Sequence, residues 1–270
     1  MGILNITPDS FSDGGAWSGP SAAADAARRM VDEGADLIDI GGESTRPGAP
    51  AVDAGEEWRR VEPVLRLIGR SLTVPISIDT YKAEVARRAL DAGATIVNDV
   101  SGLTYDEALA PVVAASGAAV VLMHNRGRSH DMYAQANYAD VMAEVAAELR
   151  GAVARATDAG IDPSRVVLDP GLGFAKRADH TLELIARFGE LHALGHPLLA
   201  GPSRKSFVTR LIGERAPEGR VFATAAAVTA AVLAGAHIIR VHDVHAMSDV
   251  VKVAEGIRTR GGPNDLPSVP

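Results

Sequence analysis

Residues that form hydrogen bonds or carry charge follow a series of short apolar runs in this 270-residue chain. Three of them, Asp79, Asn98 and Asp169, offer acceptor oxygens, and the amide adds one donor. Such a set suits a flat heterocycle that is rich in N–H groups. A second set, able to carry positive charge, comprises Arg46, Lys205, Arg240 and His242. Because such cations bind phosphate and carboxylate groups, the sequence predicts a site for a donor-rich heterocycle beside an anion.

Each of these residues also has an ordinary structural explanation. Asp79 or Asp169 could cap the helix that follows it, and Asn98 could satisfy backbone groups of a turn. Asp99 and Asp243 neighbour proposed ligand residues, and we expect them to be structural and to orient those neighbours. Polar groups after all eight runs are harder to explain as caps, because one fold would bring them together on one rim.

The apolar runs predict the strands that carry these groups. They are Gly2–Leu4, Asp36–Ile40, Pro75–Ile78, Thr95–Val97, Ala119–Met123, Arg165–Leu168, Pro197–Ala200 and His237–Val241. Most are nearly continuous in apolar character, which is typical of strands buried on both faces of a parallel sheet. Segments with helical spacing lie between them, for example Ala22–Glu33, Glu56–Ile68, Ala83–Leu90, Val141–Ala159 and Ala223–Leu233. Glycines, which favour helix ends, precede several runs: Gly34, Gly93, Gly160 and Gly235.

The order of these elements predicts the fold. Eight strand–helix units in succession indicate an α/β protein, a single (β/α)8 TIM barrel with its active site at the C-terminal ends of the strands. We expect the barrel to span residues 1–257 and residues 258–270 to form a disordered tail. An open doubly wound sheet is the rival fold. It usually has a glycine-rich turn after its first strand, whereas Asn5–Asp9 follows that strand here.

Composition narrows the partners and the location. The net charge of −7 argues against nucleic acid as a partner, because nucleic acid would need a basic face. The absence of cysteine from the sequence excludes a disulfide scaffold and a thiolate metal site. No apolar run approaches the roughly 20 residues of a membrane span, and the first residues do not resemble a signal peptide. We therefore expect a cytoplasmic protein without a membrane partner.

Five segments of the chain contain long motifs in a fixed order. They are Gly2–Gly15 (GILNITPDSFSDGG), Gly41–Gly48 (GGESTRPG), Asp169–Phe174 (DPGLGF), Ser203–Ser206 (SRKS) and Arg240–Val244 (RVHDV). Together they resemble the dihydropteroate synthases, and the resemblance extends from Met1 to about Ile257. It implies a pterin-binding transferase of folate biosynthesis that is a homodimer. The substrates would be (7,8-dihydropterin-6-yl)methyl diphosphate and 4-aminobenzoate, and the products 7,8-dihydropteroate and pyrophosphate.

The resemblance also implies roles for individual residues. Asn5 would contact the expected cofactor, Mg2+, and the diphosphate, which Arg240 and His242 would hold. The residues implied for the pterin are Asp79, Asn98, Asp169 and Lys205, with Val100 and Met123 packing against its ring. The residues implied for 4-aminobenzoate are Phe11, Thr45, Pro47, Phe174 and Ser203.

The expected chemistry depends on charge. Mg2+, Arg240 and His242 would neutralise the pyrophosphate as it leaves. Its departure gives the pterin methylene a positive charge, which a buried carboxylate such as Asp79 could stabilise. The arylamine is a nucleophile when neutral, so no strong general base is needed. The expected catalytic residues are therefore Asp79, Lys205, Arg240 and His242.

Three alternatives remain open at this point. Lys205 could form a Schiff base, as in barrel aldolases, although the neighbouring Arg204 favours anion binding. A pterin-binding methyltransferase would share the fold, but we would not expect it to keep the first motif or Ser203–Lys205. A non-catalytic pterin-binding module is the third alternative, and the complete set of rim residues argues against it.

Overall fold

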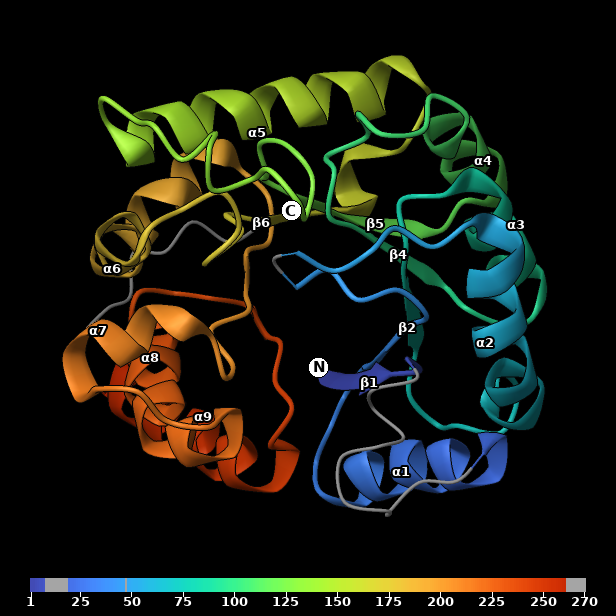
Figure 1. The fold of residues 1–270 in the computed structure, drawn as a ribbon, viewed down its shortest axis with the longest axis horizontal. Coiled ribbons are helices and arrows are strands. Elements are labelled where there is room, and N and C mark those ends of the chain that lie inside the picture. Colours follow the sequence, from blue (N-terminus) through green and yellow to red (C-terminus); the bar gives the residue numbers. More distant parts are fainter. Residues whose placement is uncertain (8–18, 47, 261–270) are drawn as a thin grey trace.

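The computed structural model describes residues 1–7, 19–46 and 48–260, in which parallel strands form a ring surrounded by helices (Figure 1). The strands of this part are β1 (Gly2–Asn5), β2 (Ile38–Gly41), β3 (Ile76–Asp79), β4 (Ile96–Asp99), β5 (Ala119–Met123), β6 (Val166–Asp169), β7 (Leu199–Ala200) and β8 (Ile238–Ile239). Each of them overlaps one predicted apolar run. The first six strands form one sheet in chain order, and β7 pairs with β8.

Two parallel bridges join these sheets into a closed ring. Leu168 in β6 bridges to Leu198 just before β7, and Gly2 in β1 bridges to Val241 just after β8. The second junction includes a hydrogen bond of 2.9 Å from the Ile3 N–H to the Val241 carbonyl. The predicted TIM barrel is therefore confirmed, and the rival open sheet is wrong.

The helices cover the outside of the ring. In the described residues they are α1 (Pro20–Asp32), α2 (Ala54–Ile68), α3 (Ala83–Asp91), α4 (Leu109–Ser116), α5 (Val141–Asp158), α6 (Ala178–Ala186), α7 (Thr209–Ile212), α8 (Val221–Leu233) and α9 (Val244–Arg258). The five helices expected from spacing are present with ends shifted by a few residues. Helix α4 has no helical spacing signal in the sequence, because LAPVVAAS is apolar almost all round and has no amphipathic stripe.

Successive side chains of each strand point alternately to the helix-facing core and to the barrel interior. In β2, Ile38 and Ile40 are fully buried and belong to the aliphatic core. Asp39 and Gly41 alternate with them and face the interior of the barrel. Helix ends follow the predicted pattern, since Gly93 after α3 has a φ of 112° that favours glycine. The barrel thus has an apolar outer layer and polar groups inside its C-terminal half.

The two ends of the chain differ in how far the structure describes them. Helix α9 ends at Arg258, and most of the predicted tail lies outside the described residues, so that the tail stays a prediction. Within residues 1–7, 19–46 and 48–260, no helix is long and apolar enough to cross a membrane.

Candidate active site

The strand register brings predicted site residues of the first four strands to one level. Asn5 of β1 pairs with Gly41 of β2, and Gly41 pairs with Asp79 of β3. Asp79 pairs in turn with Asn98 of β4. A Cβ on Gly41 would lie 3.4 Å from the Cβ of Asp79. Gly41 therefore lies directly beside the Asp79 side chain at the barrel mouth.

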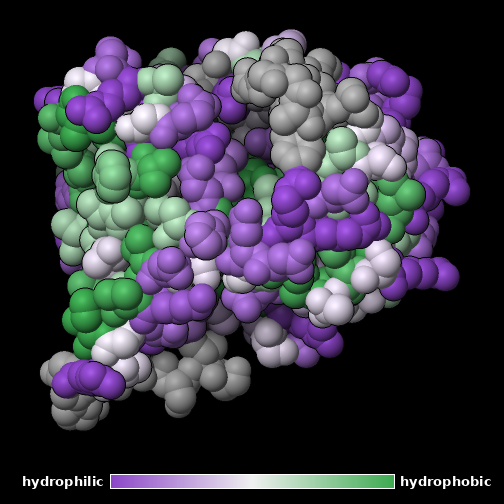
Figure 2. Space-filling view, turned by 90° about the horizontal axis from the view of Figure 1, so that it is seen from below, coloured by the Kyte–Doolittle hydropathy of each residue, from purple (hydrophilic) through white to green (hydrophobic). Residues whose placement is uncertain are grey.

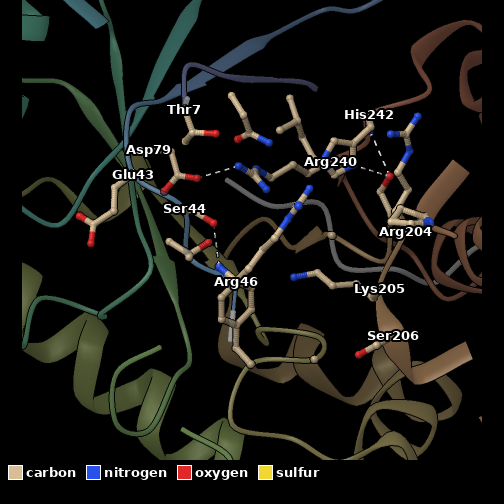
Figure 3. A pocket seen from close by; sticks show the side chains of 18 of the residues that line it. Thr7, Glu43, Ser44, Arg46, Asp79, Arg204, Lys205, Ser206, Arg240 and His242 are labelled. Atoms are coloured by element: carbon tan, nitrogen blue, oxygen red, sulfur yellow. Dashed lines mark hydrogen bonds and ion pairs between the residues drawn. The ribbon is translucent and has the colours of Figure 1, made fainter. Parts of the chain in front are cut away.

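A cavity of about 480 Å³ opens at this end of the barrel (Figure 3). The predicted site residues in its walls are Asn5, Thr45, Arg46, Asp79, Phe174, Ser203, Lys205, Arg240 and His242. In Figure 3, Arg46, Lys205 and Arg240 extend toward the same space from three different segments. The tertiary structure therefore collects the predicted cations around one cavity.

Four predicted pterin contacts lie outside the walls of this cavity. Asn98, Met123 and Asp169 are buried at the ends of β4, β5 and β6, with exposed fractions of 4%, 4% and 6%. Val100 lines an adjoining cavity of about 250 Å³, which shares Phe174 with the main one. These residues surround the barrel mouth, and their contact with a pterin stays a prediction.

The residues predicted for 4-aminobenzoate divide into two groups. Thr45, Phe174 and Ser203 all line the main cavity, although they come from different loops. Phe11 and Pro47 lie outside the described residues, and their role stays a prediction.

Arg240 lies across the barrel mouth and binds two carboxylates. Its Nε is 2.6 Å from Asp39 Oδ2, and its Nη2 is 2.7 Å from Asp79 Oδ2. Burial alone lowers the pKa of Arg240, but the two carboxylates outweigh it and raise that pKa above its usual value. The motifs imply different ends of the substrate for Arg240 and Asp79, and no local signal in the sequence indicates this ion pair. A ligand that donates an N–H group to Oδ2 of Asp79 therefore competes with Arg240.

Asp39 is a functional candidate that the sequence analysis missed. Its side chain is fully buried inside the barrel, and Oδ2 accepts hydrogen bonds from Arg240 Nε and Asn98 Nδ2, the latter at 2.9 Å. Within the run Asp36–Ile40 it was treated only as part of a strand. An ionisable residue in an otherwise apolar run was the available signal, because a buried carboxylate needs partners.

Burial shifts the pKa of several groups in the mouth. It raises the pKa of Asp79 to about 7, although Arg240 counteracts the shift. It also raises the pKa of Asp169, which accepts a backbone N–H bond of 2.7 Å. For Lys205, burial and then Arg240 lower the pKa to about 8. The Lys205 ammonium lies 3.9 Å from the centroid of the Phe174 ring, so this cation packs on the proposed aromatic wall.

The surroundings of His242 favour its neutral form, and its expected positive charge toward a diphosphate stays a prediction. Burial, followed by the nearby cations Arg204 and Arg240, lowers the pKa of His242 to about 3. Its Nδ1 lies 3.0 Å from Ser203 Oγ, and its backbone N–H donates to the same oxygen at 3.1 Å. Because Oγ accepts from the backbone, its hydroxyl hydrogen can donate to Nδ1. The imidazole proton then resides on Nε2, where it can serve as a neutral donor.

The two aspartates expected to be structural have structural partners. Asp99 accepts hydrogen bonds from the backbone N–H groups of Ser101 at 2.8 Å and Leu103 at 2.5 Å. Asp243 forms an ion pair of 2.6 Å with Arg204. Asp99 therefore shapes the turn after β4, and Asp243 fixes the segment after β8 to the Arg204 side chain. Their structural role is confirmed, and their expected effect on the orientation of Asn98 and His242 stays a prediction.

A buried lysine behind Phe174 was not predicted. Lys176 is 2% exposed, and its Nζ lies 2.8 Å from His124 Nδ1 and donates to the Phe174 carbonyl at 2.9 Å. His124 Nε2 is in turn 3.0 Å from Glu148. Burial lowers the pKa of Lys176 to about 7. The lysine ties the loop that carries Phe174 to the end of β5, and its place two residues after the DPGLGF motif was the only sequence signal.

Comparisons with known proteins agree with this geometry. The family described as pterin binding enzymes matches residues 1–242. The dihydropteroate synthase of Mycobacterium leprae is 48% identical over 270 residues, covering 97% of this chain and 94% of the relative. That of Synechocystis is 46% identical over 257 residues, covering 95% of this chain and 89% of the relative.

Solved structures give the same result at the level of the fold. Xanthomonas albilineans dihydropteroate synthase with 4-aminobenzoic acid matches with a TM-score of 0.89 and 45% identity, covering 96% of this chain and 92% of that one. Yersinia pestis dihydropteroate synthase with a sulfonamide drug matches with a TM-score of 0.91 and 41% identity, covering 96% and 94%. The chain therefore belongs to the dihydropteroate synthases, within the family of pterin-binding enzymes.

Proposed function

We propose that the chain condenses (7,8-dihydropterin-6-yl)methyl diphosphate with 4-aminobenzoate to give 7,8-dihydropteroate and pyrophosphate in folate biosynthesis. One observation carries the proposal beyond family membership. Asp79 at the end of β3 shares one cavity with cations that follow β2, β7 and β8, and further acceptors lie buried near the ends of β4 and β6. A substrate with a donor-rich ring and an anionic tail matches both sides of this arrangement.

Asp79 and Arg240 exchange partners in the proposed binding step. The pterin N–H groups replace the guanidinium on Asp79, with Asn98 and Asp169 as further acceptors. Arg240 is then available for the diphosphate oxygens. The exchange is supported by the 2.7 Å contact, which joins the guanidinium to an oxygen of the carboxylate that is proposed to bind the ring. Binding of the ring is thereby coupled to preparation of the leaving-group site.

The reaction breaks a carbon–oxygen bond and forms a carbon–nitrogen bond. The electron pair of the breaking bond leaves with pyrophosphate, whose charge Arg240 and neutral His242 stabilise through N–H donors. The arylamine nitrogen attacks the electron-poor methylene and then loses a proton to water. Asp79 stabilises positive charge on the pterin, and Lys205 contacts the pterin. Arg46 is suited to the carboxylate of 4-aminobenzoate, because its side chain extends into the cavity beside Thr45.

A pyrophosphate-release assay tests the proposed function. Both substrates together should give pyrophosphate and dihydropteroate in equal amounts, and omission of 4-aminobenzoate should stop dihydropteroate formation. Failure to form dihydropteroate from both substrates would overturn the proposal. Methyl transfer from methyltetrahydrofolate would favour the methyltransferase alternative. Trapping of Lys205 by borohydride with a carbonyl substrate would favour the Schiff-base alternative.

Mg2+ is the proposed cofactor, and Asn5 is its proposed protein ligand. Within the described part of the chain, no group of three or more His, Cys, Asp or Glu side chains could hold a metal ion. Magnesium commonly takes only one or two protein oxygens and completes its shell with water and phosphate oxygens, so Asn5 in the cavity wall fits such an ion. When bound, the ion would neutralise diphosphate charge. Chelation should abolish turnover, and Asn5→Ala should raise the Mg2+ concentration required for half-maximal rate.

A homodimer is proposed from the surface of α8 and α9. Phe222 and Leu233 on α8 are 88% and 43% exposed, and Val253 and Ile257 on α9 are 64% and 56% exposed. Figure 2 shows apolar side chains gathered on the side of the molecule where these helices lie. Such a surface is typical of an interface that excludes water. Sedimentation should give a dimer for the wild type and a monomer for Phe222→Glu, with Leu67→Glu on α2 as the exposed control.

The cytoplasm is the proposed location, because the precursors and products of folate biosynthesis are small soluble molecules. Fractionation of cells that express the chain tests this. Recovery of the chain in a membrane fraction would contradict the proposal.

A further inference from the structure

We propose that Asp39 is a positioning residue for the reaction, which sets the orientation of the Asn98 amide and tethers the Arg240 guanidinium. The inference rests on the proposed function, because it assumes that Asn98 binds the pterin and that Arg240 binds the diphosphate. Asp39 is fully buried in the middle of β2, beneath the level of Asp79. It therefore acts through its neighbours and not by contact with substrate.

The first effect of Asp39 is on the direction of the Asn98 amide. An ionised carboxylate only accepts hydrogen bonds, so the group of Asn98 that faces Asp39 must be the NH2 group. The Nδ2–Oδ2 distance of 2.9 Å agrees with this orientation. The carbonyl oxygen of the Asn98 amide is thereby turned away from Asp39 and remains available as an acceptor. Asp39 thus converts an amide that could donate or accept into an acceptor suited to a ring N–H group.

The second effect is on Arg240. Nε binds Asp39 at 2.6 Å and Nη2 binds Asp79 at 2.7 Å, so two edges of the guanidinium have separate carboxylates. Competition by pterin for Asp79 would free Nη2 but not Nε. The guanidinium would then remain charged and bound to Asp39 through Nε, while Nη2 turned to the diphosphate. Asp39 therefore allows Arg240 to change one partner without losing the other.

The remaining oxygen of Asp39 argues against a purely structural role. Among the described residues, Asp39 Oδ1 and Ser77 Oγ are buried side-chain atoms without a hydrogen-bond partner. The two residues are register partners in β2 and β3. A buried polar atom without a partner costs stability, and an apolar or neutral side chain would avoid that cost. The carboxylate is better explained by what its other oxygen does for Asn98 and Arg240.

Two substitutions separate the two effects. Asp39→Asn keeps an acceptor for Asn98 and removes the charge that tethers Arg240, with almost no change in side-chain size. Asp39→Leu removes both the acceptor and the charge. Asp36→Asn, an exposed carboxylate at the opposite end of the same run, is the matched control. For each protein we would measure the melting temperature, turnover, and the affinity for 6-hydroxymethyl-7,8-dihydropterin. This compound, called the alcohol below, lacks the diphosphate.

The expected results differ between the variants. Asp39→Asn should lower turnover by about tenfold or more, change the affinity for the alcohol by less than about threefold, and not lower the melting temperature. Asp39→Leu should lower turnover further and weaken binding of the alcohol by about tenfold, because the Asn98 amide is free to rotate. Asp36→Asn should match the wild type in all three measurements.

Two outcomes would overturn the inference. One is wild-type turnover in folded Asp39→Asn, and the other is a loss of activity that only follows a fall in melting temperature. If Asp39→Leu does not fold, the Asp39→Asn measurements still test whether Asp39 is needed for turnover. Absence of binding and turnover in the wild type would instead overturn the proposed function, so the two failures are distinguishable.

Discussion

The two sides of the barrel mouth are built differently. The acceptors Asp79, Asn98 and Asp169 stand inside strands of four residues that belong to the continuous six-stranded sheet. Lys205 and Arg240 follow β7 and β8, which have two residues each and are joined to the rest of the ring by single bridges. One side of the site is therefore held by regular backbone hydrogen bonds, and the other by the short segments that close the barrel.

This difference matches what each side has to do. Recognition of a planar ring needs acceptors at fixed positions, and extended strands in register provide them. Leaving-group stabilisation needs cations that can move from carboxylate partners to phosphate oxygens. Arg240, bound to Asp39 and Asp79 in the structure, illustrates the second case. We infer that fixed acceptors select the substrate, whereas exchangeable cations act on its anionic end.

Loss of Asp79 should have the largest effect, because this residue connects the two sides. Asp79→Ala removes an acceptor for the pterin and the carboxylate that binds Nη2 of Arg240. We expect turnover to fall by about 1000-fold in a folded protein. Asp91→Ala, at the exposed end of α3, is the control. Near-normal pyrophosphate release by folded Asp79→Ala would show that the acceptor side is assigned incorrectly.

Loss of Arg240 should affect the anionic end more than the ring. Arg240→Ala should lower turnover by about 100-fold, and affinity for the pterin diphosphate should fall more than affinity for the alcohol. A pair of calorimetric titrations checks this, with Arg150→Ala on the surface of α5 as the control. Equal losses of affinity for both ligands would remove the distinction between the two sides.

Acidification should weaken the acceptor side specifically. Burial raises the pKa of Asp79 to about 7, so its carboxylate gains a proton as the pH falls below that value and no longer acts as an anionic acceptor. As the pH falls from 7 to 5, affinity for the alcohol should therefore fall. The steepest expected loss is about tenfold per pH unit, the limit for one group that must be deprotonated for binding. His242, with a pKa of about 3, should add no inflection in this range. If the affinity of an Asp79→Asn variant changed with pH as much as that of the wild type, the pH dependence would belong to another group.

The smallest expected effect concerns the tautomer of His242. Ser203→Ala removes the hydroxyl 3.0 Å from Nδ1 and should lower turnover by about fivefold, because the Nε2–H donor is no longer enforced. Affinity for the alcohol should stay unchanged, since the imidazole is proposed to act on the diphosphate and not on the ring. Ser164→Ala, which is exposed before β6, provides the comparison. A larger loss of affinity than of turnover would place Ser203 on the acceptor side.

Most of the fold could be predicted from the sequence because its signals are local. Runs such as Ala119–Met123 and glycines such as Gly93 report burial and backbone conformation at their own positions. Helix α4 and the two-residue strands were less predictable, since an apolar segment without periodicity fits either a helix or a strand. The site motifs were recognisable for the same reason, as long stretches of contiguous residues.

The partners within the site could not be predicted in this way. Asp39 and Arg240 are separated by 201 positions in the chain, and no local pattern indicates that they meet. The lowered pKa of His242 likewise depends on burial of the imidazole and on Arg204, which the fold brings near it from a distant segment, although Arg240 is its neighbour in the chain. Lys176 and His124 form another such pair, 52 positions apart.

The sequence by itself determined the order of strands and helices, the end of the barrel that carries chemistry, and the family to which the motifs belong. These properties depend on side chains within a few residues of one another. Only the tertiary structure decided which carboxylates hold Arg240, which atom of Asn98 is left to accept, and which groups keep their charge. Such properties depend on burial and on distances across a closed ring, where hydrogen bonds and ion pairs are set by residues far apart in the chain.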